Sequence, residues 1–115
     1  MAQYLVLIYG DEKAFEEGGQ GLWDEVMKGH NDFGAEHGPA IAGGNALQPT
    51  STATSIRKES SGEFVVTDGP FLETKEALGG YYLIEAQDLD EAIAVAKKIP
   101  APAGGLEVRP VMVFD

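Results

Sequence analysis

Apolar and polar positions recur along this chain with the periods of strands and helices, and these periods predict its elements. A continuous apolar run over residues 3 to 9 predicts a central strand covered on both faces. From Leu22 to His37, apolar residues recur every three to four positions and polar residues occupy the opposite face, which indicates an amphipathic helix. Gly38-Pro39 ends that helix, and residues 40 to 47 are predicted to return as a strand.

A hairpin is predicted in the middle of the chain. Residues 52 to 59 and 63 to 67 are rich in strand-forming side chains and are joined at Ser60-Ser61-Gly62. The second strand of this hairpin leads directly into Asp68-Gly69-Pro70, where Pro70 fixes its own φ and Gly69 lets the backbone bend. We therefore expect Asp68 to be presented at a rigid corner.

The last third of the chain predicts a strand, a helix and a final strand. Residues 79 to 86 predict the first strand, and Asp88 with Glu91 three positions later marks the start of the helix. Pro100 stops the helix, and residues 107 to 114 predict the closing strand. The residues expected on the buried stripe of this helix are Leu89, Ala92, Ile93, Ala96 and Ile99.

The order strand, helix, strand thus occurs twice, with a hairpin inserted between the two units. This order predicts an α+β fold of the ferredoxin-like, dimeric α/β-barrel type, with two helices on one face of an antiparallel sheet. The 115 residues fit a single domain over 1 to 115. Two helices on one side leave the other face of the sheet uncovered, so we expect a homodimer.

Composition narrows the classes of partner. The formal net charge of −11 disfavours nucleic acid and anionic membrane surfaces, and the lack of cysteine excludes disulfides and thiol chemistry. The first apolar run is too short for a signal peptide, and no run approaches a membrane-spanning length, so a soluble, cytoplasmic protein is expected. Against this acidic background, Arg57, Lys75 and Arg109 are candidate anchors for an anion, or members of ordinary salt bridges.

His30 is the main candidate for chemistry. It lies within the apolar arc of the first helix, so helix geometry directs its side chain towards the sheet. An Asp68 partner would orient the imidazole as a general base or acid. The alternatives are a core histidine bonded to a carbonyl or hydroxyl group, and a surface turn at Asp68 whose charges are merely solvated.

The sequence carries no signal for a metal or a cofactor. The two histidines, His30 and His37, are seven residues apart on one helix, which is not the usual spacing of close ligands. No glycine-rich phosphate loop opens a helix, and no serine nucleophile elbow is present. We therefore expect neither a bound metal nor a nucleotide or other cofactor.

Several motifs carry a family resemblance over nearly the whole chain. They are Tyr9-Gly10-Asp11-Glu12, Gly43-Gly44 with Leu47 and Pro49, Ala53-Thr54 with Arg57, Asp68-Gly69-Pro70-Phe71, Gly79-Gly80-Tyr81-Tyr82 and Glu107-Val108-Arg109-Pro110. Together they resemble the YCII-related proteins, in the branch named for its Asp-Gly-Pro-Phe motif. The resemblance implies a ferredoxin-like dimer with a paired histidine and aspartate in a pocket between helix and sheet, and the matching residues are His30 and Asp68.

The leading hypothesis is a small dimeric, enzyme-like protein that binds a compact polar metabolite and moves a proton. His30 oriented by Asp68 would be the catalytic pair, in chemistry of the lyase, isomerase or lactone-hydrolysing type. The expected further ligand contacts are Glu73, Lys75, Arg57 and Arg109, with Tyr82 as a wall of the pocket. One alternative is a non-catalytic ligand- or protein-binding module linked to transcription regulation, since relatives occur alongside sigma factors. The other is a purely structural dimer domain.

Overall fold

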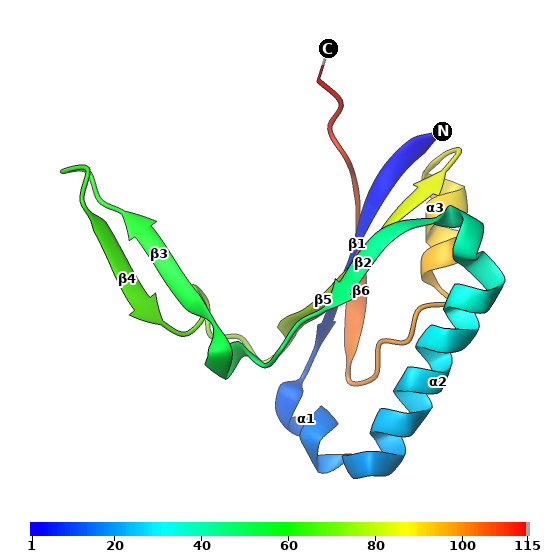
Figure 1. Ribbon diagram of the computed structural model, residues 1–115, viewed down its shortest axis with the longest axis horizontal. Helices are drawn as coiled ribbons and strands as arrows, with labels where there is room; N and C mark the ends of the chain where they lie inside the picture. The colour runs from blue at the N-terminus through cyan, green and yellow to red at the C-terminus, as the bar shows by residue number, and fades with distance from the viewer. Residues whose placement is uncertain (115) are drawn as a thin grey trace.

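The computed structural model describes residues 1–114, which form an α+β fold built on a four-stranded antiparallel sheet with the strand order β2-β5-β1-β6 (Figure 1). A separate two-stranded sheet contains β3 and β4. The elements are β1 (Ala2–Gly10), α1 (Glu12–Glu17), α2 (Gly19–His37), η1 (Gly38–Ala40), β2 (Ile41–Ala46), η2 (Thr50–Thr52), β3 (Thr54–Lys58), β4 (Phe64–Asp68), β5 (Ala77–Ala86), α3 (Leu89–Ala96) and β6 (Gly104–Pro110).

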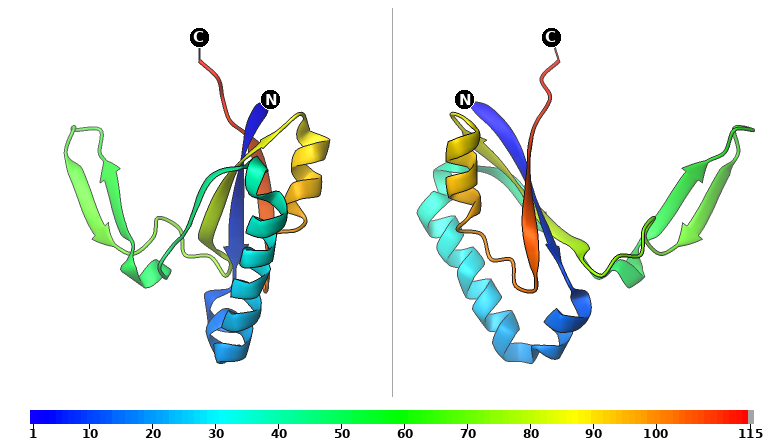
Figure 2. Two further views of the ribbon diagram at one scale, coloured as in Figure 1. Left: turned by 45° about the vertical axis from the view of Figure 1, so that its right-hand side comes forward. Right: turned by 180° about the vertical axis from the view of Figure 1, so that it is seen from behind.

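The hydrophobic core lies between the four-stranded sheet and the helices α2 and α3, which cover the same face (Figure 2). Successive side chains of a strand point to opposite faces, so Tyr4 and Val6 of β1 and Ile84 and Ala86 of β5 share the helix side. Phe33 supplies the buried side chain of α2. The core residues contributed by α3 and the segment after it are Ala92, Val95, Ala96 and Ile99.

The opposite face of the sheet is not covered by any helix in the described residues (Figure 2). Leu5 pairs with Leu83, and Leu7 pairs with Tyr81, so these four half-buried side chains form an apolar strip on that face. The prediction that the first strand is covered on both faces is therefore wrong within one chain. The strand is central, but a single chain supplies helices for one side only.

Two helices near the N-terminus differ from the sequence-based predictions. The short helix α1 was not predicted, because its six residues show no apolar period, and it is instead fixed at its start by the Asp11 carboxylate. The main-chain nitrogens of Lys13 and Ala14 lie 3.0 and 3.2 Å from that carboxylate. The helix α2 begins at Gly19, three residues before the expected start.

The C-terminal elements also need correction. Asp88 caps α3 as predicted, and its carboxylate accepts a hydrogen bond from the Glu91 main chain at 2.9 Å. The buried stripe includes Val95, whereas Leu89 and Ile93 are exposed. The last strand runs from Gly104 to Pro110 rather than from 107 to 114, because β6 pairs with β1 only as far as Tyr4. Beyond it, Met112, Val113 and Phe114 form an exposed apolar tail.

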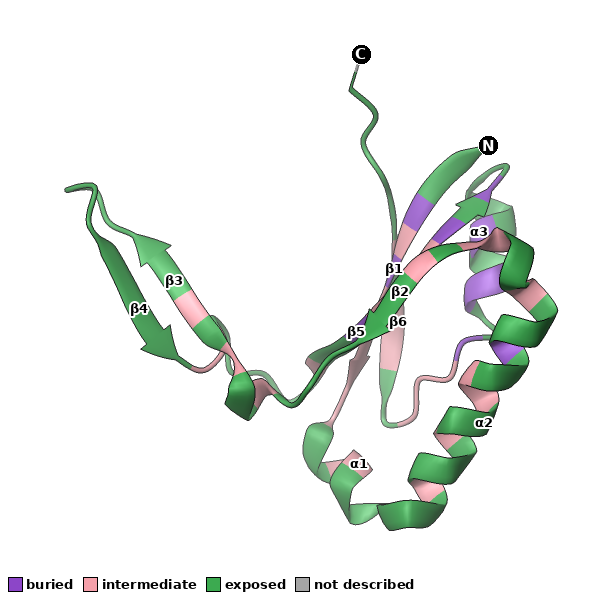
Figure 3. Ribbon diagram, viewed as in Figure 1, coloured by how far each residue is buried: buried purple, intermediate pink, exposed green. Residues whose placement is uncertain are grey.

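The hairpin of β3 and β4 projects from the rest of the molecule, on the side of the sheet away from the helices (Figure 1). We call residues 54–68 the arm. Colouring by burial shows that the arm is almost entirely exposed, while the buried residues gather between the sheet and the helices (Figure 3). The arm joins the body through residues 47–53 and 69–76, which continue from β2 and lead into β5.

Candidate functional site

The candidate site is built on a hydrogen bond between a helix and the sheet beneath it. His30 of α2 places Nδ1 2.7 Å from the hydroxyl oxygen of Tyr82 on β5. Both side chains are partly buried, and their ring centroids are 5.8 Å apart. The prediction that His30 points at the sheet is therefore confirmed, and the partner group is a hydroxyl.

Neighbouring residues hold the Tyr82 ring in place. The edge of the ring meets Phe33 with 4.9 Å between centroids, and Phe33 is itself buried one helical turn from His30. On the neighbouring strand, a Cβ at Gly44 would lie 2.9 Å from Cδ1 of Tyr82. A glycine is thus required at position 44 for the ring to lie across β2, which gives Gly44 a structural role at the site.

Burial sets the charge states of the pair. Partial burial lowers the pKa of the His30 imidazole from its ordinary value, because the charged form loses hydration. Burial likewise raises the pKa of the Tyr82 phenol. Both groups are therefore neutral at pH 7, and their hydrogen bond joins a neutral imidazole to a neutral phenol.

The tautomer of His30 decides what its second nitrogen can do. Within the described residues Nε2 makes no hydrogen bond, and it is not among the buried atoms that lack a partner, so it is not fully buried. If Nδ1 carries the proton and donates to the Tyr82 oxygen, Nε2 has a free lone pair and can act as a base. If Tyr82 donates to Nδ1, Nε2 carries the proton and can donate it.

Asp68 does not lie beside His30 within one chain. It is the last residue of β4, where it is exposed and pairs across the arm with Thr54. Among residues 1–114 its carboxylate makes no hydrogen bond or ion pair, and burial alone accounts for the lowered pKa of His30. The expected contact between His30 and Asp68 is therefore absent from the single chain, because the hairpin leaves the sheet before Asp68 is reached.

The Asp-Gly-Pro-Phe turn has a visible structural role at the base of the arm. Gly69 has a φ of +100°, which favours glycine, and its amide donates to the Ala53 carbonyl at 2.7 Å. The guanidinium carbon of Arg57 lies 4.8 Å from the centroid of the Phe71 ring, a cation–π contact. Arg57 and Phe71 line a hollow of about 240 Å³ on the polar face of the arm.

The remaining predicted ligand contacts lie elsewhere on the chain. Glu73 and Lys75 are exposed on the segment between the arm and β5. Arg109 pairs with Leu5 on the uncovered face of the sheet, and its Nε lies 3.7 Å from a Glu107 oxygen. Of the residues predicted from the sequence, the structure brings together His30 and Tyr82, and within one chain it keeps Arg109 on the opposite face of the sheet.

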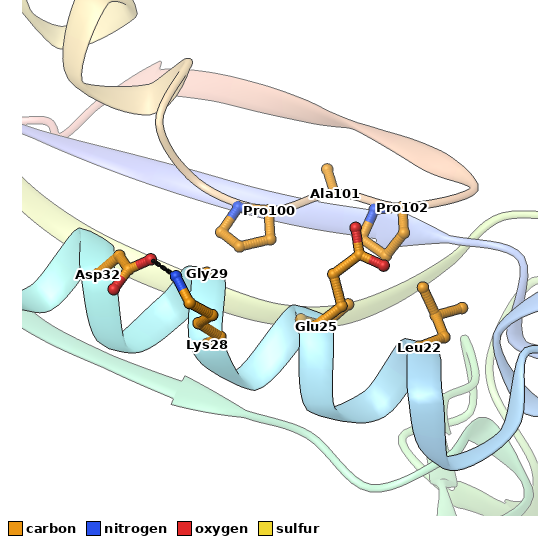
Figure 4. Close-up of a pocket in the computed structure, with 9 residues that line it drawn as sticks. Leu22, Glu25, Lys28, Gly29, Asp32, Pro100, Ala101 and Pro102 are labelled. Carbon is orange, nitrogen blue, oxygen red and sulfur yellow. Dashed lines mark hydrogen bonds and ion pairs between the residues drawn. The ribbon is translucent and has the colours of Figure 1, made fainter.

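A wider groove of about 520 Å³ lies between α2 and the segment that leads from α3 into β6 (Figure 4). It lies between Leu22, Glu25 and Gly29 of the helix and the segment Pro100 to Pro102, with the Lys28–Asp32 ion pair at its edge. His30 does not line this groove, although it is the next residue after Gly29. Its lining contains no histidine or tyrosine, and Lys28 and Asp32 are an exposed ion pair, so we place the candidate chemistry at the partly buried His30.

Two broader features of the described residues bear on function. They contain no group of three or more histidine, aspartate or glutamate side chains arranged to hold a metal ion. No helix among them is both long enough and apolar enough to cross a membrane.

The sequence analysis did not identify Phe33 and Gly44 as supports of Tyr82. The signals available for them were the i, i+3 spacing of Phe33 from His30 and the paired glycines at 43 and 44.

We expect the His30 imidazole to titrate below about 6.5 in an NMR pH titration, because burial disfavours its charged form. The unfolded chain then binds the proton more readily, so the free energy of unfolding should fall as pH decreases below about 6.5. A His30→Gln variant should lose this part of the pH dependence, whereas Asp68→Asn should leave the titration unchanged. Titration of His30 above its ordinary value would contradict the burial argument and would point to a carboxylate nearby.

The fold and the site together define a small α+β protein with an imidazole and a phenol paired between a helix and an antiparallel sheet. The model of the YCII-related domain family matches residues 2–115, and the chain belongs to this family. It is also similar to an uncharacterized protein of Rhizobium meliloti (strain 1021), with 36% identity over 119 residues that cover 96% of this chain and 93% of the relative.

Proposed function

We propose that this protein is a small dimeric, enzyme-like protein of the ferredoxin-like α/β-barrel type that binds a compact polar metabolite and transfers a proton. The observation that carries the proposal is the 2.7 Å contact between His30 Nδ1 and the Tyr82 hydroxyl, which leaves Nε2 free for a ligand. Tyr82 takes the orienting role that a carboxylate would have. His30 is the catalytic residue, and Tyr82 is a positioning residue.

Proton transfer would begin from the neutral imidazole. With Nδ1–H donated to the Tyr82 oxygen, Nε2 takes a proton from a carbon or oxygen acid of the ligand. The imidazolium that forms keeps its bond to Tyr82, but burial disfavours its charge, so it returns the proton readily to another atom of the ligand. This cycle of abstraction and return fits isomerase or lyase chemistry, and activation of water by the same nitrogen fits lactone hydrolysis.

A homodimer through the uncovered sheet face is part of the proposal. The strip of Leu5, Leu7, Tyr81 and Leu83 is supported as a contact surface by its apolar character in a chain whose net charge of −11 opposes polar association. Two sheets stacked through such strips pack about 10 Å apart and cover both faces of β1.

A non-catalytic ligand-binding module is the second candidate. It is favoured by the groove beside α2 and the hollow on the arm, because His30 lines neither of these two spaces in which a ligand could bind. In this alternative the His30–Tyr82 bond would fix the helix on the sheet, and a ligand would bind without being changed. The two candidates differ in whether the bound molecule exchanges a proton with His30.

The test begins with native mass spectrometry of the gently purified protein, to identify a small molecule that it retains. That molecule is then incubated with the protein in D₂O. We expect deuterium uptake at carbon, or product formation, to fall by about 10²-fold or more in His30→Gln, because a general base is lost. His37→Gln, on the same helix, is the matched control and should retain the wild-type rate.

A retained ligand that takes up no deuterium and forms no product with the wild-type protein would reject proton transfer and support the binding module. A rate that is equal in wild type and His30→Gln would reject His30 as the base. Tyr82→Phe tests the positioning role of Tyr82 separately from the basicity of His30. This variant should lower the rate, and a shift in the ¹⁵N resonances of His30 should report a changed balance between the two imidazole tautomers.

A further inference from the structure

The arm is an isolated element within one chain. Its strands β3 and β4 pair with each other over five residues each, and in the described residues neither pairs with the four-stranded sheet. A two-stranded hairpin on its own is marginally stable in water. A well-formed hairpin with no third strand of its own chain beside it therefore indicates that another surface supports it.

One face of the arm carries an exposed apolar cluster, with the polar pair Thr54 and Asp68 at its base. Ile56 pairs with Val66, and Phe64 lies on the same face across from Lys58. Ile56, Phe64 and Val66 are 56%, 65% and 63% exposed, whereas the exposed fractions of the most buried residues of the same types in the core are close to zero. The opposite face carries Ser55, Arg57, Val65 and Thr67, which line the hollow beside Phe71. The arm is thus an amphipathic ribbon with its apolar side uncovered.

The direction of the arm is fixed by its own chain. At its base, the main-chain nitrogen of Thr50 lies 2.9 Å from a Glu12 carboxylate oxygen, and the Thr50 hydroxyl also donates to that carboxylate. The Leu47 amide donates to the Gly79 carbonyl at 2.8 Å, which continues the pairing of β2 with β5 beyond the end of the strand. These bonds hold the arm away from its own sheet, in the projecting position that Figures 1 and 2 show.

The size of the exposed surface indicates what covers the arm. The chain exposes 8186 Å², whereas a compact monomer of this length exposes about 6,000 Å². The radius of gyration is 16.3 Å, against about 13 Å for a compact domain of 115 residues. The excess of about 2,000 Å² is more than the roughly 800 Å² that each partner buries in an interface of standard size.

The arm and the apolar tail of Met112 to Phe114 both lie on the side of the sheet away from α2 and α3 (Figure 2). That side also carries the uncovered strip of the sheet. A second copy seated on the strip would therefore lie next to the arm of the first copy. A two-fold axis would give the same contact to both chains, as closed dimers require.

We propose that the apolar face of the arm, formed by Ile56, Phe64 and Val66, packs against a second copy of this chain, so that two copies exchange arms across the dimer. The inference rests on the dimer of the proposed function and is independent of its proton transfer. Arm exchange explains why the hairpin keeps a regular apolar face outside its own core. It also explains the excess of exposed surface over that of a compact monomer.

The absence of cysteine from the sequence allows a direct test on the full chain. Val66→Cys and Val65→Cys place single thiols on opposite faces of the same strand, at neighbouring positions. At micromolar protein concentration, alkylation of Val66→Cys by N-ethylmaleimide should be slower by about tenfold or more than that of Val65→Cys, because the dimer buries the first thiol. Dilution below the dimer dissociation constant should remove the difference.

The oligomeric state gives the second measurement. Sedimentation should find a dimer for the wild type, a shift towards monomer for Val66→Asp, and a wild-type dimer for Val65→Asp. Circular dichroism should show that both variants keep the core, which lies apart from the arm. A monomeric wild type would overturn the proposal. It would also be overturned if Val66→Asp remained as dimeric as the wild type. Protection of Val66→Cys that persists on dilution would also overturn it, since the arm would then fold onto its own chain.

Discussion

Replacing Phe33 by alanine is expected to lower the free energy of unfolding by about 3 to 5 kcal/mol, the range for a phenylalanine removed from a packed core. Phe33 is 1% exposed and is a central side chain of the core between α2 and the sheet. Its ring lies 4.9 Å from that of Tyr82 and 5.3 Å from that of His37. The cavity left by alanine would remove the lateral support of Tyr82.

The matched control for Phe33→Ala is Met27→Ala on the same helix, because Met27 is 40% exposed and its truncation should cost less than about 1 kcal/mol. Urea denaturation at a fixed protein concentration measures both variants and keeps any dimer contribution constant. Equal losses for the two variants would contradict the placement of Phe33 in the core.

Replacing Gly104 by alanine is expected to destabilise the protein by about 3 kcal/mol or more, because the added methyl group meets main-chain atoms that cannot rotate away. A Cβ at Gly104 would overlap the Tyr9 carbonyl oxygen and would lie 2.6 Å from Cα of Gly10. Gly104 pairs with Gly10 at the start of β6, so relief of the clash would separate this edge strand from β1.

Gly105→Ala provides the control for Gly104→Ala. An added Cβ at Gly105 meets nothing within 4 Å, although the residue is next in the same strand. We expect its thermal midpoint to stay within a few degrees of the wild type, while that of Gly104→Ala falls by roughly 10 °C or more. Similar midpoints for the two variants would show that the close approach of β1 and β6 does not constrain position 104.

Elements with a clear period, a cap or a turn signal could be predicted from the sequence, whereas α1 and the bounds of β6 could not. Most of α2 was predicted, from Leu22 to His37, because its apolar stripe extends over several turns, and α3 was predicted from its Asp88 cap. The helix α1 has six residues and no stripe, so its local signal was too weak. The shift of β6 arose because the apolar tail at 111–114 resembles a strand, while the pairing of β6 with β1 stops at Pro110 opposite Tyr4.

The candidate site was predicted in part. The helical position of His30 showed that its side chain faces the sheet, and the alternative of a hydroxyl partner was recognised. The choice of Tyr82 over Asp68 required the tertiary structure, because His30 and Tyr82 are 52 positions apart and the segment between them includes an arm whose direction no local pattern indicates. That direction depends on the distant contact between Thr50 and Glu12.

Sequence patterns alone indicate the family, the α+β class, the helices α2 and α3 and the inward orientation of His30, because periodicity and caps act over a few neighbouring residues. The tertiary structure decided which groups meet. It placed Tyr82 against His30, left Asp68 on the arm and exposed the apolar face of Ile56, Phe64 and Val66. These outcomes depend on long-range strand pairing and on the point at which the chain leaves the sheet, and neither is encoded in a short stretch of sequence.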